Sequence, residues 1–181
     1  MSTDKSKRLA FRVVVCCALI LAALLYPSVA RYIFNKTTRY KVFNTAAFGT
    51  VEDVKYFIER GVSVNDKTVN VMSLLHCAAM NNTDIDVMKY LIEQGADVNA
   101  KDDYGRTPLH YAADTDSYNI ETLEYLIDNG VDVNAKDNDG ETPLDYAIDF
   151  AIRYTGNRNI FKEKEPILRK AGGKRGEELP E

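Results

Sequence analysis

The sequence is poor in the residues and motifs on which most enzymes and metalloproteins depend. Its 181 residues include no tryptophan, two histidines and three cysteines. It contains no glycine-rich phosphate loop, no nucleophile elbow, no zinc-protease motif and no EF-hand calcium loop. These absences argue against catalysis, so we predict a protein that is not an enzyme and that binds no cofactor or metal.

The few candidate reactive side chains have a simpler structural interpretation. Cys16 and Cys17 lie in an apolar N-terminal segment, and without that segment Cys77 has no partner for an intramolecular disulfide. A nucleophilic His76-Cys77 pair is the alternative, and we prefer a structural thiol. The histidines, His76 and His110, lack a third metal ligand that recurs at matching spacing. We interpret the nearby acids as helix caps and solvated turns: Asp84, Asp86, Asp97, Asp102 and Asp103.

The chain repeats itself with a period of about 35 residues. The octapeptide at 95–102 recurs at 130–137 with one difference, and a weaker copy lies at 61–68. Self-similarity at such a period indicates stacked repeats, each of which buries its apolar face against its neighbours. Stacked repeats usually bind a partner rather than catalyse a reaction.

Each period also contains two predicted helices. The first begins after a hydroxyl residue suited to cap a helix, and proline follows two of these residues. A pair of small residues, Ala-Ala in the best copies, would let neighbouring helices approach closely. The second helix has apolar residues at helical spacing, and Gly95 or Gly130 ends it with a positive φ. The predicted capping and first-turn residues are Ser73, Thr107, Pro108, Thr142 and Pro143.

These motifs resemble the ankyrin repeat family over roughly residues 39 to 175. The resemblance is carried by Thr-Pro-Leu-His at 107–110, the Ala-Ala pairs, Leu-Ile before a glycine, and the Gly-Ala-Asp-Val-Asn-Ala-Lys-Asp arm at 95–102. It implies an all-α solenoid of about four helix-turn-helix units with short β-turn or hairpin arms. It also implies that His76 and His110 bond the neighbouring turn backbone and the capping hydroxyl, and that Cys77 fills a small buried position.

We divide the chain accordingly. The first unit lacks Thr-Pro-Leu-His, and the last replaces the histidine with Asp145 and places Pro166 within its second helical pattern. Both are interpreted as caps, since terminal units expose a side that inner units bury. The predicted segments are a signal peptide or membrane anchor (1–30), a linker (31–38), a degenerate N-terminal capping repeat (39–69), two repeats (70–103 and 104–138), a C-terminal capping repeat (139–175) and a tail (176–181).

The resemblance implies that hairpin tips and the exposed side of the first helices form a concave face that holds a partner. Tyr104 and Arg106 are the preferred anchors, because tyrosine and arginine are enriched at binding hot spots. The partner-binding candidates are Lys101, Asp103, Tyr104, Arg106, Asp114, Asp116, Lys136, Asn138, Asp139 and Glu141, with Lys67, Asn70 and Met72 from the preceding unit. Other tyrosines are expected in the core: Tyr56, Tyr90, Tyr111, Tyr125 and Tyr146.

The N-terminus resembles an export signal. Residues 1–12 hold four basic side chains and one acid, residues 13–26 are apolar, and small residues precede Arg31. We predict cleavage between Ala30 and Arg31. An uncleaved anchor is the main alternative, although 14 helical residues span only about 21 Å of a roughly 30 Å hydrocarbon core. A buried cytosolic helix and a lipoprotein, which needs a cysteine at the cleavage point, are weaker alternatives.

Charge narrows the choice of partner. Without residues 1–30 the chain keeps 19 basic and 26 acidic residues, so the net charge falls from −4 to −7. An acidic surface argues against nucleic acid and anionic membranes, and favours a cationic or neutral protein. The Gly-Gly-Lys ending at 172–174 resembles that of bacterial ankyrin proteins, which favours a periplasmic or secreted location.

The hypothesis is therefore an exported monomer that binds another protein through the concave face of an ankyrin stack. The first alternative is a single-pass anchored scaffold with its repeats outside the cytoplasm. The second is a dedicated inhibitor or protector subunit of an extracytoplasmic enzyme.

Overall fold

The computed structural model describes residues 41–68, 71–81, 84–114, 120–150 and 158–180. The chain divides into two compact units, 1–40 and 41–181, and every described residue belongs to the second. The signal segment, its cleavage point between Ala30 and Arg31, and the linker at 31–38 lie outside the described residues. Among those residues, no helix combines the length and the apolar character needed to cross a membrane.

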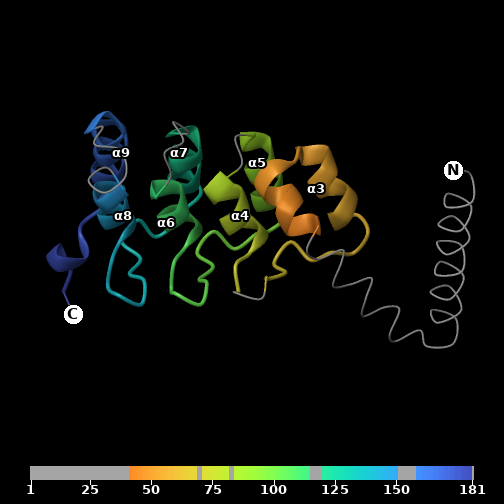
Figure 1. The fold of residues 1–181 in the computed structure, drawn as a ribbon, viewed down its shortest axis with the longest axis horizontal. Coiled ribbons are helices and arrows are strands. Elements are labelled where there is room, and N and C mark those ends of the chain that lie inside the picture. Colours follow the sequence, from red (N-terminus) through yellow and green to blue (C-terminus); the bar gives the residue numbers. More distant parts are fainter. Residues whose placement is uncertain (1–40, 69–70, 82–83, 115–119, 151–157, 181) are drawn as a thin grey trace, which may run out of the picture. The chain divides into compact units, whose positions relative to one another are not determined.

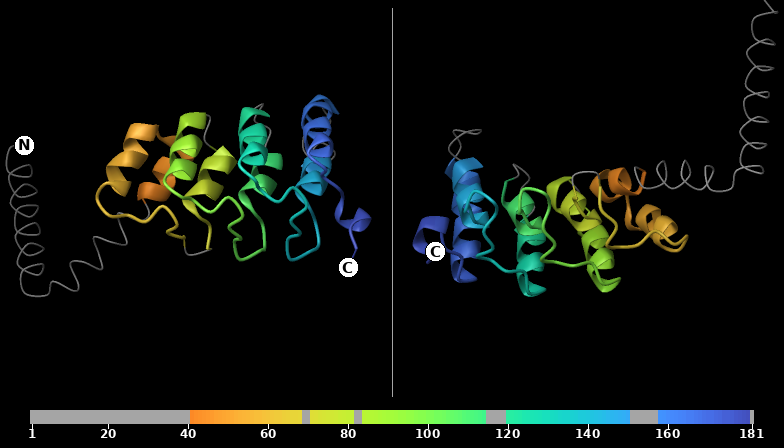
Figure 2. Two further views of the ribbon diagram at one scale, coloured as in Figure 1. Left: turned by 180° about the vertical axis from the view of Figure 1, so that it is seen from behind. Right: turned by 90° about the horizontal axis from the view of Figure 1, so that it is seen from below.

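The described residues form helical pairs that follow one another in sequence order (Figures 1 and 2). They contain no β-strand, only an isolated antiparallel bridge between Lys67 and Ser73. The predicted all-α ankyrin stack is confirmed. The pairs are the helix at 41–48 with α3 (Val51–Ile58), α4 (Leu74–Asn81) with α5 (Ile85–Glu93), α6 (Pro108–Ala113) with α7 (Ile120–Asp128), and α8 (Pro143–Phe150) with α9 (Arg158–Lys170).

Two rows of helices share one hydrophobic core. In the inner row α4 packs on α6 and α6 on α8, and in the outer row α3, α5, α7 and α9 pack in succession. Leu75, Leu109 and Leu144 occupy corresponding positions in the inner row and are completely buried. Burying one such side chain contributes roughly 1.5 to 3 kcal/mol, and much of this burial is made between units, so a single unit could not retain it.

The helix boundaries follow the capping signals. Thr107 precedes α6, and its hydroxyl and backbone N–H both meet the His110 ring. Asp84 caps α5 by accepting a bond from the Asp86 N–H. Gly95 and Gly130 follow the outer helices with φ of 86° and 80°, as predicted, in a conformation that costs glycine little.

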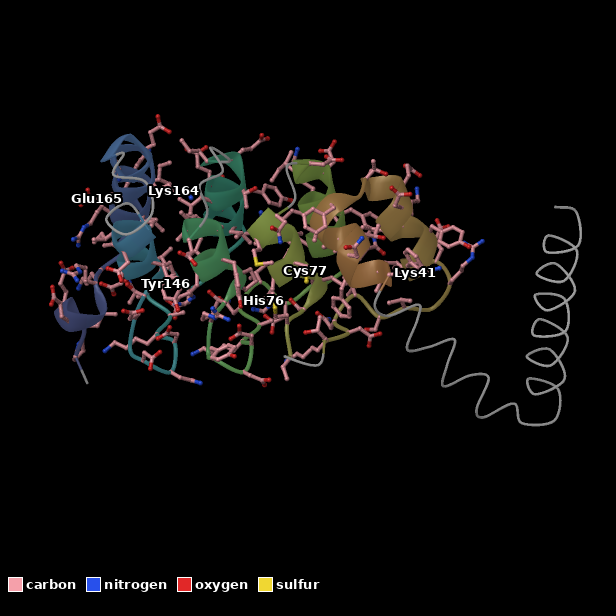
Figure 3. The ribbon with its side chains drawn as sticks, in the orientation of Figure 1. Lys41, His76, Cys77, Tyr146, Lys164 and Glu165 are labelled. Carbon is pink, nitrogen blue, oxygen red and sulfur yellow. The ribbon has the colours of Figure 1, made fainter. Side chains whose placement is uncertain are left out.

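Pro166 lies within α9, where it interrupts the helical pattern of the sequence. The helix continues from Arg158 to Lys170 although an interior proline costs about 3 kcal/mol or more. Tertiary contacts offset this cost. Leu168 is completely buried, and the Lys164 side chain, 2% exposed, donates to the carbonyl oxygens of Ala112 and Ala113 at the end of α6 (Figure 3).

Candidate partner-binding face

The loops that lead into α4, α6 and α8 project from one edge of the stack (Figures 1 and 2). We call residues 101–106 and 136–141 the hairpin tips. In the first tip the Asp102 N–H donates to the Arg106 carbonyl at 3.0 Å, and the Gly105 N–H donates to the Asp102 carbonyl at 3.1 Å. Gly105 has a φ of 78°, which a residue with a side chain rarely adopts.

A buried carboxylate shapes each tip. Asp102 is 7% exposed, and its oxygens accept bonds from the Tyr104 and Arg106 N–H groups at 2.9 Å and from the Tyr111 hydroxyl at 2.7 Å. Burial raises the pKa of Asp102, but these bonds and the Arg106 charge outweigh it, so the pKa is lowered. The expectation that Asp102 is a solvated turn residue was wrong, because Tyr111, nine residues later, folds back over it.

Asp137 repeats this arrangement in the next tip. Its carboxylate is 8% exposed and accepts bonds from the Asp139 and Glu141 N–H groups and from the Tyr146 hydroxyl. The two hairpin tips therefore have the same hydrogen-bonding pattern, each around its own buried aspartate.

The two histidines link each tip to the unit before it. The Ser73 N–H donates to His76 Nδ1 at 3.1 Å, which leaves Nε2 to donate to the Arg106 carbonyl at 3.0 Å. His110 makes the same bonds with Thr107 and with the Glu141 carbonyl. Burial lowers the pKa of both rings and keeps them neutral. The role implied by the family resemblance is confirmed in geometry.

Asp145 takes the histidine position in the last unit and receives a different set of donors. Its carboxylate accepts bonds from the Thr142 N–H and hydroxyl, from the Gly176 N–H at 2.7 Å and from the Arg175 Nε at 2.8 Å. Hydrogen bonds from these groups outweigh the opposing effect of burial and lower the pKa of Asp145. The replacement therefore attaches the C-terminal turn, η2 (Gly176–Glu178), to the stack.

An asparagine ladder, not predicted from the sequence, joins the arms of successive units. Asn99 donates to the Gly130 carbonyl at 3.3 Å and accepts from the Asp132 N–H at 2.7 Å. Asn65 and Asn134 make equivalent bonds one unit before and one unit after. The sequence feature that could have predicted this ladder is the recurrence of asparagine at the fifth position of each octapeptide.

The preferred anchors, Tyr104 and Arg106, have unequal roles. Tyr104 is 59% exposed. Arg106 is partly buried: its guanidinium carbon lies 4.5 Å from the Tyr104 ring centre and 4.6 Å from that of Tyr111, and it pairs with Asp102 at 3.0 Å. Arg106 therefore supports the tip and positions Tyr104, which is the accessible member of the pair.

Three further candidates also serve the stack. The Lys101 ammonium donates to the Lys136 carbonyl at 2.9 Å, and the Lys136 ammonium donates to the Pro180 carbonyl at 3.4 Å. The Asn138 amide donates to the Asp103 carbonyl at 2.9 Å. The Lys101 and Asn138 bonds join one tip to the next, and the Lys136 bond joins the second tip to the C-terminal residues. Among the other candidates, the side chains of Asp103, Asp139 and Asp114 are exposed, and those of Glu141 and Met72 are half-exposed. Asp116 and Asn70 lie outside the described residues.

The tyrosines that we expected in the core differ in how deeply they are buried. Tyr111 is buried, and Tyr90, Tyr125 and Tyr146 pack half-buried against the core. Tyr56 was predicted wrongly: it is 50% exposed on α3, with the Arg60 guanidinium stacked 3.6 Å from its ring centre. The first unit has no preceding outer helix in the described residues to cover that side of α3.

Cys77 has the environment of a structural thiol. It is buried on α4 (Figure 3), and burial raises its pKa to about 11, which suppresses the reactive thiolate. Across the described residues, no three His, Cys, Asp or Glu side chains are grouped so that they could hold a metal ion.

Comparison with known proteins agrees with this geometry. A family model described as ankyrin repeats (3 copies) matches residues 42–137 and 75–163. A search of curated proteins found no match. The two matches together cover more than half of the sequence and contain both hairpin tips and both histidine links. The chain therefore belongs to the ankyrin repeat family.

Proposed function

We propose that this protein is an exported interaction module that binds a partner protein through the concave face of its stack and performs no chemistry of its own. Ankyrin repeats in general are protein–protein interaction modules. The observation that carries the proposal is the exposure of Tyr104, 59% of its surface, on a hairpin tip whose backbone is bonded from within. Large exposed aromatic side chains on rigid supports are common binding anchors.

The rigidity of the tips supports the proposal. Asp102 and Asp137 fix the shape of each tip, and Lys101 and Asn138 hold the tips at a set separation. A surface that is already ordered loses little conformational entropy when a partner binds. Affinity can then come from a few accessible side chains, among them Tyr104 and the neighbouring carboxylates of Asp103 and Asp139.

Export rests on the sequence alone. The basic start, apolar segment and small residues before Arg31 support a cleaved signal. N-terminal sequencing of the native protein tests this. If the signal is cleaved, the first residue of the native protein is Arg31. An uncleaved N-terminus recovered in the membrane fraction would instead support the membrane-anchored alternative.

Affinity capture from the extracytoplasmic fraction tests the binding face. The full chain should retain one partner in stoichiometric amount, and Tyr104→Ser with Asp103→Lys should reduce its recovery at least tenfold. Tyr56→Ser with Glu52→Lys is the matched control, because it makes the same changes at exposed positions on α3. Equal recovery by both double variants would place binding away from the tips. An enzymatic activity that persisted without the partner would contradict the proposal altogether.

A further inference from the structure

A second surface lies at the opposite end of the inner helices from the hairpin tips. Each inner helix contains a pair of small residues, at 46–47, 78–79 and 112–113, that is buried against the neighbouring units, and 147–148 take this place in the last unit. The residue directly after the pair lies at the C-terminal end of the helix and meets solvent. We call these four residues the inner-helix row: Phe48, Met80, Asp114 and Asp149.

The inner-helix row changes character along the stack. Phe48 is 70% exposed and Met80 37%, which places two large apolar side chains in solvent on adjacent units. At the same position in the next two units stand carboxylates, with Asp114 exposed and Asp149 half-exposed. All six residues of α6 are buried, so in that unit the row is the main place where the inner helix can touch a partner.

The combination of apolar and acidic halves restricts what the inner-helix row fits. Residues 41–181 hold 16 basic and 26 acidic side chains, a net charge of −10, so the field of the stack attracts cationic partners. Phe48 and Met80 exclude a purely charged ligand, because charged groups would be desolvated against them without compensation. Asp114 and Asp149 would repel an acidic ligand, and their carboxylates would be desolvated without compensation against a wholly apolar ligand.

Helix spacing sets the length of the ligand. Packed helices lie about 8 to 10 Å apart, so four positions in successive units span roughly 24 to 30 Å. An extended chain rises about 3.3 Å per residue, and about eight or nine residues cover that distance.

We infer that the inner-helix row binds an extended segment of a partner protein, with bulky apolar residues at one end and lysine or arginine at the other. The apolar end contacts Phe48 and Met80, and the basic end contacts Asp114 and Asp149. The inference rests on the proposed binding function and names the chemistry of the partner.

A displayed library of random ten-residue peptides, selected on the full chain, tests the inference. Enriched peptides should combine aromatic or aliphatic residues at one end with lysine or arginine at the other. In fluorescence anisotropy, Phe48→Ser with Met80→Ser and, separately, Asp114→Lys with Asp149→Lys should each weaken the best peptide at least tenfold. The second pair should also reduce the salt dependence of binding.

The matched control variants make the same kinds of change in charge and apolarity at exposed positions outside the inner-helix row. Glu124→Lys with Asp128→Lys reverses two exposed carboxylates on α7, and Tyr56→Ser removes an exposed aromatic ring from α3. Each should change the affinity less than twofold. Thermal unfolding of every variant confirms that the stack is intact, since all these positions are at least partly exposed.

Three results would overturn the inference. They are enrichment of peptides without the combined apolar and basic pattern, failure of the library to yield any binder, and unchanged affinity in both row variants. If the native partner is still captured through Tyr104 in any of these cases, the proposed function stands and only the inner-helix row is refuted. If the intact stack captures no partner either, the proposed function fails first.

Discussion

Val71 provides a direct test of the energetics of the hairpins. It lies at the position that Gly105 and Gly140 occupy in the next two units, and its N–H donates to the Thr68 carbonyl at 3.1 Å, as that of Gly105 does to Asp102. All three residues have a positive φ: 58° for Val71, 78° for Gly105 and 82° for Gly140. Val71 is the one residue with a side chain that has a positive φ among the described residues.

The expected gain from Val71→Gly follows from two opposing effects. A β-branched residue in the left-handed region costs about 1 to 3 kcal/mol, and glycine removes that strain. Glycine loses about 0.5 to 1 kcal/mol more conformational entropy on folding. Val71 is half-exposed, so little burial is lost. We therefore expect the free energy of unfolding to rise by about 1 kcal/mol.

Urea unfolding, followed by circular dichroism, measures the change. Val71→Ala relieves the β-branch alone and should give a smaller gain than glycine. Gly105→Val is the reverse experiment: an added Cβ would lie 2.5 Å from the Asn138 Oδ1 atom and 2.9 Å from its backbone nitrogen, so a loss above about 2 kcal/mol is expected. If Val71→Gly lowers stability, the strain assigned to this hairpin does not exist.

Three further predictions concern the links between units. Because burial lowers the pKa of His76 and His110, the unfolded chain binds more protons below about pH 6.5, and stability should fall from there towards pH 5 by up to about 1.4 kcal/mol per pH unit for each histidine. His76→Gln with His110→Gln should abolish this slope, and an unchanged profile in urea titrations would disprove the assignment. Asn99→Ala removes two bonds between units and should cost about 1 to 2 kcal/mol in chemical unfolding, whereas Asn129→Ala, whose amide bonds only within its own turn, should cost less than about 0.5. Asp145→Asn should reduce the hydrogen-exchange protection of the η2 backbone amides while the protection of α6 is kept; uniform loss in both elements would argue against a local clamp.

The helices were predictable because their signals are local. Capping hydroxyls, apolar spacing and terminal glycines act within one unit, and repetition of the unit supported each interpretation of the pattern. Pro166 marks the limit of such reasoning. A local rule predicts a break there, and the contacts of Lys164 and Leu168 with the rest of the stack overrule it.

The candidate site was less predictable because its bonds cross between units. The residues next to Asp102 predict a solvated turn acid, because the Tyr111 hydroxyl that bonds its carboxylate lies nine positions later in the sequence. In the same way Lys101 has the sequence context of a surface lysine, yet its ammonium donates to the Lys136 carbonyl in the next tip. Exposure of Tyr104 was predicted correctly from its place in a turn. Exposure of Phe48 depends on which neighbours the stack provides, and that information is absent from the residues around it.

The bonds made by the C-terminal residues bear on how such an array can change in length during evolution. The Lys174 N–H donates to the Asn134 side chain, and the Lys174 carbonyl oxygen lies 2.8 Å from the Thr142 hydroxyl oxygen. The Gly176 N–H and the Arg175 guanidinium donate to the Asp145 carboxylate. These are the attachment points that the arm and hairpin of an additional unit would need. Duplication of a unit in the interior leaves them untouched, whereas a unit added behind Asp145 would first have to displace this segment.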